Sequence, residues 1–379
     1  MRRYAELDWL RGLMLVLMTV THLPTWFSNA LGQPFGFVSA AEGFVFLSAF
    51  LVGCIYARVA RERGFAAMRA VVWRRAGKVY LAHLAVLLFL LWVLVPIGVA
   101  KDARAITNLA SFYLAHPDEA LTGGLLLAYN PPLLDILPMY VLFIAASPGL
   151  LEYGMRRGWT RILVASAFLW LLAQLDAGPG LYDAVSRATG VSIPYRETGA
   201  FSYLAWQLMW VLGIAAGTQA GTTDERPARW PRAWIAAAAT VALGFFAWRH
   251  LDGQVPASAV WAQATDKWHL GPLRLLDFGA LVVLVVQMRR TIAEHAQASV
   301  LATLGKSSLT VFCASVVICL AALTVVSEPD TALHWQDSAL LAGTLVTLYA
   351  VALACAAGRR LARPPAVLTG PRPLPRTAR

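Results

Sequence analysis

Residues 77–98, GKVYLAHLAVLLFLLWVLVPIG, form an almost uninterrupted apolar run in which the only charged side chain is Lys78, near the start. About 20 apolar residues in a helix are enough to cross the hydrocarbon core of a bilayer. The run therefore predicts a membrane-spanning helix, not a helix on the surface of a soluble domain.

The same pattern recurs along the chain. It predicts ten apolar blocks, at residues 7–27, 36–57, 77–98, 133–153, 161–178, 201–219, 233–250, 270–288, 301–325 and 338–357. The 379 residues are 58% hydrophobic and 14% charged, whereas a soluble domain is roughly 45–50% apolar and about 25% charged. We therefore predict an all-α, polytopic integral membrane protein of about ten transmembrane helices. A single membrane domain, 1–358, precedes a basic, Pro-rich tail, 359–379.

The formal charge of +11 predicts the orientation of these helices. With residues at block ends counted with the adjoining loops, 23 of the 32 Lys and Arg fall on the side of the two termini, six fall on the opposite side, and three lie within the blocks (Arg11, Arg274 and Lys306). Because cytoplasmic loops are enriched in Lys and Arg, both termini are predicted to be cytoplasmic. This distribution explains the basic balance by topology, so we expect the lipid bilayer as a partner and no nucleic acid. The four cysteines lie inside apolar blocks without metal-ligand spacing, so no metal site is expected.

Ionisable side chains inside the blocks are candidates for a functional site, because a charge at the centre of a membrane helix costs about 2.5 to 3.5 kcal/mol. Arg11 and His22 are eleven residues apart, which places them on one helix face separated by about 16 Å. Glu42 and Asp135 share the predicted depth of His22. A carboxylate beside His fixes its tautomer and stabilises the imidazolium, so the group predicts a general base. Either carboxylate fits the orienting role.

A basic segment precedes the third block. Arg74, Arg75 and Lys78 have helical spacings of three and four, so they can converge on one phosphorylated ligand at the cytoplasmic surface. Topology and attraction to anionic lipid account for most of the other positive charges in this segment.

Two further kinds of residue are candidates for substrate binding. Arg274 can hold a ligand carboxylate, and a pair with Asp277 three residues later is an equal alternative. Trp206 and Trp268 can stack on sugar faces, although Trp at a membrane interface commonly serves as an anchor.

Several motifs resemble known sequences. The segments LDWLRGLMLVLMTVTH, AEGFVFLSAFLVG and WRRAGKVYLAHL, which begin at residues 7, 41 and 73, resemble the first three helices of the acyltransferase-three superfamily of membrane O-acyltransferases. Four more, LLDILPMYVLF, LAWQLMWVLGIAAG, LGPLRLLDFGAL and LGKSSLTVFCASV, resemble the OpgC branch, which attaches succinyl groups to osmoregulated periplasmic glucans. The resemblance covers roughly residues 4–320.

The resemblance implies a multi-pass enzyme of the bacterial inner membrane. Its donor substrate would be cytoplasmic succinyl-CoA or another acyl-CoA such as acetyl-CoA, with no tightly bound cofactor. Its acceptor would be a hydroxyl of a periplasmic glucan or another envelope polysaccharide. His22 matches the catalytic histidine, Arg11 its partner arginine, and Glu42 the acidic position of the second helix.

Several alternatives stay open from the sequence. Acyl transfer can be direct or pass through an acyl-His intermediate. A transporter or exporter could instead use the buried His and carboxylates as a proton relay. The absence of visible inverted repeats or broken-helix signals weakens that second interpretation. The sequence also allows a homo-oligomer.

Overall fold

The computed structural model describes residues 5–220, 230–251, 258–297, 299–326 and 333–361. Within these ranges the chain is helical without β-strands, which confirms the all-α class. The elements are α1 (Ala5–His22), α2 (Trp26–Leu31), α3 (Ala40–Phe89), a π-helix (Leu90–Leu94), α4 (Val95–Ala100), α5 (Arg104–Leu109), α6 (Ser111–Ala115), α7 (Pro117–Leu125), α8 (Ile136–Arg157), α9 (Thr160–Gln174), α10 (Ala177–Thr189), a 3-10 helix (Tyr195–Thr198), α11 (Tyr203–Ala220), α12 (Arg232–Leu251), α13 (Ala259–Ala264), α14 (Pro272–Ala296), α15 (Val300–Lys306), α16 (Ser308–Ala322) and α17 (Trp335–Leu361).

The chain is a membrane protein by the length and apolar composition of its helices. Five helical segments in the described ranges are long and apolar enough to span a membrane, namely Ala40–Ala100, Ile136–Arg157, Tyr195–Ala220, Arg232–Leu251 and Trp335–Leu361. Two bent helix pairs raise this number to seven if each pair is one span. The predicted ten crossings and the cytoplasmic termini stay predictions.

The bent pairs differ from the expectation of uninterrupted helices. α9 and α10 meet at 100°, and α15 and α16 meet at 97°. Asp176 adopts a left-handed conformation (φ 56°) at the first bend, and Ser307 leaves helical geometry (φ −118°, ψ 27°) at the second. The bend residues themselves are neither proline nor glycine, although Gly178 and Pro179 follow the first bend and Gly305 precedes the second.

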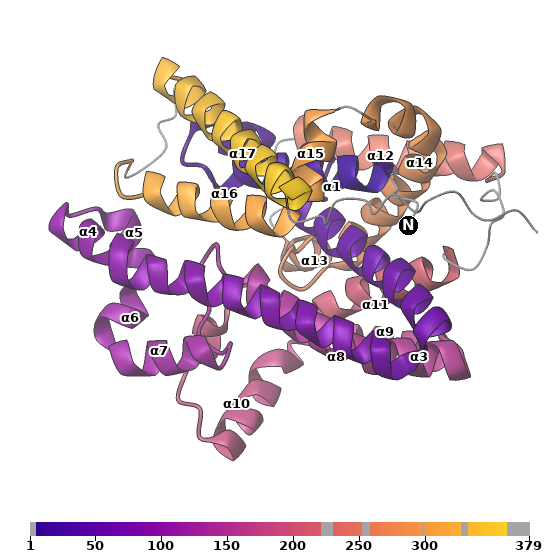
Figure 1. Cartoon of the computed structure of the whole chain (residues 1–379), viewed down its shortest axis with the longest axis horizontal. Helices are drawn as coiled ribbons and strands as arrows, with labels where there is room; N and C mark the ends of the chain where they lie inside the picture. The colour runs from indigo at the N-terminus through magenta and orange to yellow at the C-terminus, as the bar shows by residue number, and fades with distance from the viewer. Residues whose placement is uncertain (1–4, 221–229, 252–257, 298, 327–332, 362–379) are drawn as a thin grey trace, which may run out of the picture.

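Helix α3 contains two of the predicted blocks. It begins at a capping box, in which the Ser39 hydroxyl accepts from Ala41 N and the Glu42 carboxylate accepts from Ser39 N. Gly64 interrupts its 50 residues with φ 81° and ψ 166°, a backbone conformation that side chains with a Cβ disfavour. Figure 1 shows the two arms of α3 meeting at an angle. Block 36–57 overlaps the arm before Gly64, and block 77–98 begins on the second arm and continues through the π-helix into α4.

Helices α1 and α15 touch through their backbones. A Cβ on Gly12 would lie 1.9 Å from the carbonyl oxygen of Leu301, and one on Gly305 would lie 1.8 Å from that of Asp8. Glycine is therefore required at both positions, as at other close contacts between membrane helices. This contact places the bend between α15 and α16 beside Arg11.

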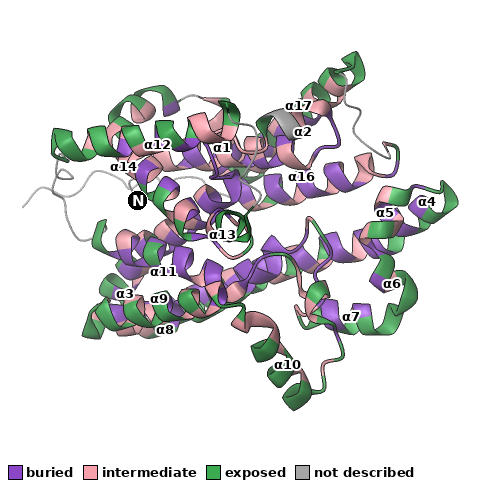
Figure 2. Ribbon diagram, turned by 180° about the vertical axis from the view of Figure 1, so that it is seen from behind, coloured by how far each residue is buried: buried purple, intermediate pink, exposed green. Residues whose placement is uncertain are grey.

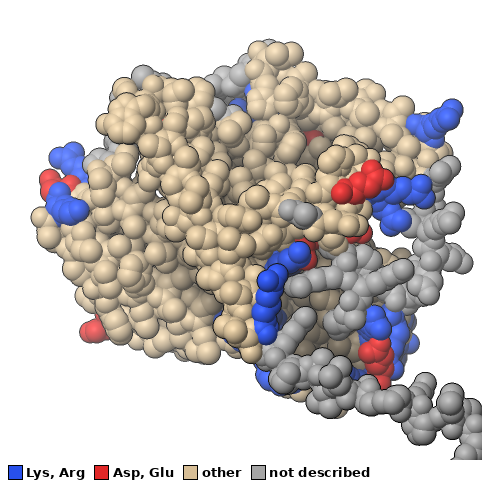
Figure 3. Space-filling view, turned by 45° about the horizontal axis from the view of Figure 1, so that its top comes forward, with Lys and Arg blue, Asp and Glu red and all other residues tan. Residues whose placement is uncertain are grey.

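The surface matches a protein that faces lipid. Figure 2 shows buried residues gathered along α3, α11 and α16, whereas α10 and α12 turn mostly exposed or half-buried residues outward. Figure 3 shows a wide face on which Lys, Arg, Asp and Glu lie mainly at the margins. Charge is scarce where hydrocarbon would surround the helices, which is the pattern that a bilayer requires.

Candidate functional site

Two cavities in the helical body share a wall. The Arg11 cavity has a volume of about 400 Å³ and is lined by Arg11, Arg75 and residues around the α15–α16 bend. The His22 cavity has a volume of about 600 Å³ and is lined by His22, Asp135 and residues of the loops before α8, α11 and α14. Ile136 and Phe312 line both cavities. These two apolar side chains therefore form part of the partition between them.

His22 is the last residue of α1 and is half-buried at the wall of the His22 cavity. Among the described residues, neither of its ring nitrogens has a hydrogen-bond or ion-pair partner within bonding distance. Asp135 lies in the same lining with 9% of its surface exposed, and its Oδ2 accepts from Ala200 N at 3.2 Å. The structure thus brings His22 and Asp135 to one cavity without a hydrogen bond or ion pair between them. The ring nitrogens of His22 are available to a ligand hydroxyl.

Glu42 and Arg274 lie together outside the linings of both cavities. Arg274 Nη1 is 2.6 Å from Glu42 Oε1, and the side chains are 3% and 0% exposed. Arg274 Nε donates to the carbonyl oxygen of Thr265 at 3.1 Å. The second oxygen of Glu42 accepts from the backbone and hydroxyl of Ser39. In this structure the hydrogen bonds of Glu42 therefore go to Ser39 and Arg274, and those of Arg274 do not go to Asp277.

Arg11 lines the other cavity. Its Nη2 donates to the hydroxyl of Ser308, the first residue of α16, and its Nη1 is 3.9 Å from Asp8 Oδ1. The guanidinium therefore reaches the N-terminus of α16, where backbone N–H groups favour negative charge.

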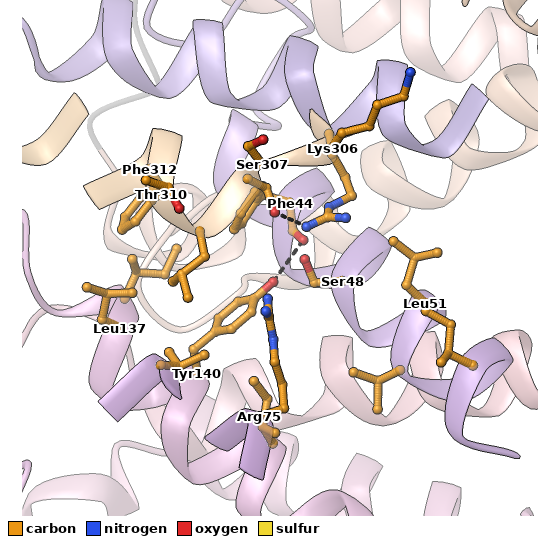
Figure 4. A pocket seen from close by; sticks show the side chains of 18 of the residues that line it. Phe44, Ser48, Leu51, Arg75, Leu137, Tyr140, Lys306, Ser307, Thr310 and Phe312 are labelled. Atoms are coloured by element: carbon orange, nitrogen blue, oxygen red, sulfur yellow. Dashed lines mark hydrogen bonds between the residues drawn. The ribbon is translucent and has the colours of Figure 1, made fainter. Parts of the chain in front are cut away.

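Three more cations line the Arg11 cavity, namely Arg75, Lys306 and Arg359. In Figure 4, Arg75 and Tyr140 extend toward Ser48, whereas the Lys306 ammonium points away from them. Arg359 Nη2 donates to Ser307 Oγ at 3.0 Å. Arg359 is the first residue of the predicted tail, but in the structure it belongs to α17. Residues 362–379 of the tail lie outside the described part of the chain.

The three predicted phosphate-binding residues are separated by the structure. Arg75 lines the Arg11 cavity, whereas Arg74 and Lys78 are exposed and lie outside its lining. Arg74 Nε donates to the carbonyl oxygen of Ala70 at 3.3 Å. Consecutive residues of a helix point about 100° apart, so Arg74 and Arg75 face different surroundings.

The two tryptophan candidates have different positions. Trp268 lines the His22 cavity and is 40% exposed. Trp206 is fully buried, and its Nε1 donates to the carbonyl oxygen of Trp268 at 3.1 Å. Trp268 is therefore available to a ligand, whereas Trp206 is buried and fixes the Trp268 backbone through this hydrogen bond.

Lys267 is a cavity residue that the sequence pattern did not reveal, because it lies in a predicted exterior loop. It lines the His22 cavity beside Trp268, with Nζ 4.9 Å from the centre of the Trp268 ring. Burial lowers the pKa of Lys267, and the nearby carboxylates of Glu42 and Asp135 offset part of this effect. The cavity lining therefore contains a half-buried ammonium group.

The helical membrane domain contains one cavity lined by arginines and another with an available histidine, and apolar side chains separate the two. This arrangement suits a membrane-embedded group-transfer protein. The model of the OpgC protein family matches residues 3–360, and the chain belongs to this family. Neither the curated proteins nor the solved structures compared with the chain give a match. The family assignment confirms the resemblance to the OpgC branch and supports an acyltransferase.

Proposed function

We propose that the protein is an O-acyltransferase of the acyltransferase-three superfamily that moves an acyl group, specifically succinyl, from cytoplasmic acyl-CoA to a hydroxyl of a periplasmic glucan. The supporting observation is the pair of cavities that share Ile136 and Phe312, with Arg11 at one and His22 at the other. In this proposal the protein crosses the bacterial inner membrane ten times, with both termini in the cytoplasm. The Arg11 cavity then opens to the cytoplasmic side and the His22 cavity to the periplasmic side.

The Arg11 cavity is suited to an acyl-CoA, which binds as a substrate and not as a resident cofactor. Its lining combines the basic groups of Arg11, Arg75, Lys306 and Arg359 with apolar side chains of α3 and α8. Cations bind phosphate oxygens, and apolar walls suit the pantetheine arm. Arg75 is the one member of the predicted basic trio in this lining and is therefore the strongest phosphate ligand among the three.

The His22 cavity is suited to the acceptor. His22 takes the proton of a glucan hydroxyl, and the hydroxyl oxygen attacks the thioester carbonyl carbon. A carbon–oxygen bond forms, the carbon–sulfur bond breaks, and the imidazolium returns the proton to the departing thiolate. Of the two predicted orienting carboxylates, Asp135 is favoured, because it lines the same cavity as His22 whereas Glu42 does not. Trp268 offers an exposed ring to a sugar face at the same cavity.

The decisive experiment is acyl transfer by purified protein. Labelled succinyl-CoA or acetyl-CoA is incubated with the protein and a glucan, and the product is identified by mass. We expect transfer by the wild type and a loss of about 10²- to 10⁴-fold in His22→Ala, the range typical for a general base.

His295→Ala is the matched control, because His295 is exposed on α14 and lines neither cavity. This control should transfer acyl groups at the wild-type rate. Normal transfer by a folded His22→Ala protein would remove His22 from the chemistry. An absence of transfer by the wild type with every donor would refute the acyltransferase proposal.

A sugar or glucan transporter is the second candidate, because the structure contains two bent helix pairs. Broken helices commonly build substrate sites in secondary transporters, and the α15–α16 bend lies at the Arg11 cavity. Proteoliposomes loaded with labelled glucan separate the two functions. Release of unmodified glucan without acyl-CoA would favour the transporter.

A further inference from the structure

We propose that Lys267 selects the acyl group, with its ammonium binding the distal carboxylate of a dicarboxylic acyl chain such as succinyl. This inference rests on the proposed transferase function and assigns its donor preference to one residue. It replaces Arg274 as the predicted carboxylate ligand. Lys267 lines the His22 cavity, whereas Arg274 lies outside both cavity linings.

The ammonium of Lys267 is not committed to another protein group. Within the described ranges, no carboxylate oxygen lies within 4.0 Å of its Nζ. Its Nζ lies 4.9 Å from the centre of the Trp268 ring and 6.0 Å from that of Phe201. An aromatic face holds a cation in position and leaves its N–H donors available. Lys267 therefore has the donors that a ligand carboxylate requires.

The turn that carries Lys267, residues 265–270, is fixed by side chains from three helices. Its carbonyl oxygens accept hydrogen bonds from Trp170 and Gln174 of α9, Trp206 of α11 and Arg274 of α14. The turn is thus held on several sides, and the position of Lys267 relative to His22 is set before a ligand binds. A specificity group needs this kind of support from its surroundings.

The remaining cations near the cavity are already paired. Arg274 binds Glu42 at 2.6 Å. Arg196 lines the cavity, but its side chain is 82% exposed and its Nε lies 3.2 Å from Glu197 Oε1. Among the described lining residues, Lys267 is therefore the cation that combines partial burial with freedom from a carboxylate partner.

The charge of the lining makes this cation necessary for a dicarboxylic chain. Asp135 and Glu197 line the same cavity, so an incoming carboxylate meets other negative groups. The acyl group is at the end of the pantetheine arm, and its distal carboxylate is the leading end as it passes Ile136 and Phe312. Lys267 offsets the repulsion that this carboxylate would otherwise meet.

The test compares donors of equal chain length. Purified Lys267→Met protein is assayed with succinyl-CoA and with butyryl-CoA, whose acyl chain has four carbons but no carboxylate. We expect kcat/KM for succinyl-CoA to fall about 10- to 100-fold, the effect of losing one hydrogen bond to a charged group. Butyryl transfer should change less than about threefold, since no charge is lost from its complex.

Lys101→Met is the matched control, because Lys101 is exposed and lines neither cavity. Lys267→Arg retains the charge and should recover part of the succinyl transfer. This variant also tests the proposal if the Met variant does not fold. An equal fall for both donors in the Met and Arg variants would overturn the proposal and assign Lys267 a structural role. An unchanged donor ratio in Lys267→Met would overturn it as well. Absence of transfer by the wild type would instead refute the underlying transferase function.

Discussion

Arg274 and Glu42 form a buried ion pair, with Nη1 and Oε1 separated by 2.6 Å. The pair joins the first turn of α14 to the first turn of α3. Through its Nε, Arg274 also holds the carbonyl oxygen of Thr265, at the start of the turn that carries Lys267. Two charges that stand out in the sequence as candidate site groups thus form a framework behind the His22 cavity.

This buried pair should be important for stability. Glu42→Leu or Arg274→Met alone should lower the free energy of unfolding by about 3–5 kcal/mol, because each leaves a buried charge uncompensated. The double variant should lose less than the sum of the two. Thermal unfolding in detergent measures the effect. The exposed pair Arg58–Glu62 on α3 is the control, and its removal should change the unfolding temperature little. Additive losses in the double variant would contradict a direct pair.

The neighbouring arginines of α3 should differ in their effect on CoA binding. Arg75→Ala removes a cation from the Arg11 cavity and should weaken CoA binding about tenfold, with a smaller effect at high salt. Arg74→Ala removes an exposed cation outside the cavity lining and should change the affinity less than twofold. Calorimetric titration with CoA at two ionic strengths measures both. Equal weakening by the two variants would assign the arginines to the surface potential alone.

The preference for a carboxylated donor should depend on pH through Lys267. Burial lowers the pKa of Lys267 below its ordinary value of 10.5, while Glu42 and Asp135 raise it and Arg274 lowers it. As pH rises through this lowered pKa, the ammonium loses its proton, so succinyl transfer should fall relative to butyryl transfer. Between the lowered pKa of the folded protein and 10.5, Lys267 is protonated only in the unfolded chain. Its titration therefore makes the free energy of unfolding rise with pH in this window.

The pH profile of the donor ratio measures this effect, and Lys267→Arg is its control. Arginine keeps its charge throughout the accessible range, so the ratio should then be independent of pH. A drift of equal size in the Arg variant would assign the titration to another group.

Trp206→Phe should loosen the turn beneath Trp268. The substitution keeps an aromatic ring in the core but removes the Nε1 donor to the Trp268 carbonyl oxygen. We expect a loss of about 0.5–1.5 kcal/mol in the free energy of unfolding, because one hydrogen bond is lost while the carbonyl oxygen still accepts from Ser202 N. Chemical unfolding in detergent measures the loss. Trp234→Phe, at an exposed position on α12, should leave the stability unchanged. A stability equal to that of the wild type in Trp206→Phe would mean that the hydrogen bond contributes nothing.

Apolar patterning predicted the helical regions, since each of the ten blocks overlaps helix in the structure. The α15–α16 break was not predicted in this way, because Ser307 at the bend does not interrupt the apolar pattern, and the close contact through Gly12 and Gly305 joins segments far apart in the sequence. The placement of Arg11 and His22 on one helix follows from local geometry. The partner of Glu42 does not, because Arg274 is 232 residues away in the chain.

Lys267 was missed for a related reason. In the sequence it belongs to a predicted exterior loop, where a charged residue is ordinary and gives no sign of burial. Only the tertiary hydrogen bonds to the turn 265–270 bring it to the wall of the His22 cavity.

The wall formed by Ile136 and Phe312 has an electrical consequence when the two cavities open to opposite sides of the membrane. A membrane potential that elsewhere falls across about 30 Å of hydrocarbon falls here across a few side chains. A succinyl carboxylate that passes this wall carries one negative charge through that field, worth about 2.3 kcal/mol per 100 mV. With the cytoplasm negative, the field drives the charge outward. Succinyl transfer is then electrogenic, whereas transfer of an uncharged acyl group through the same protein is electrically silent.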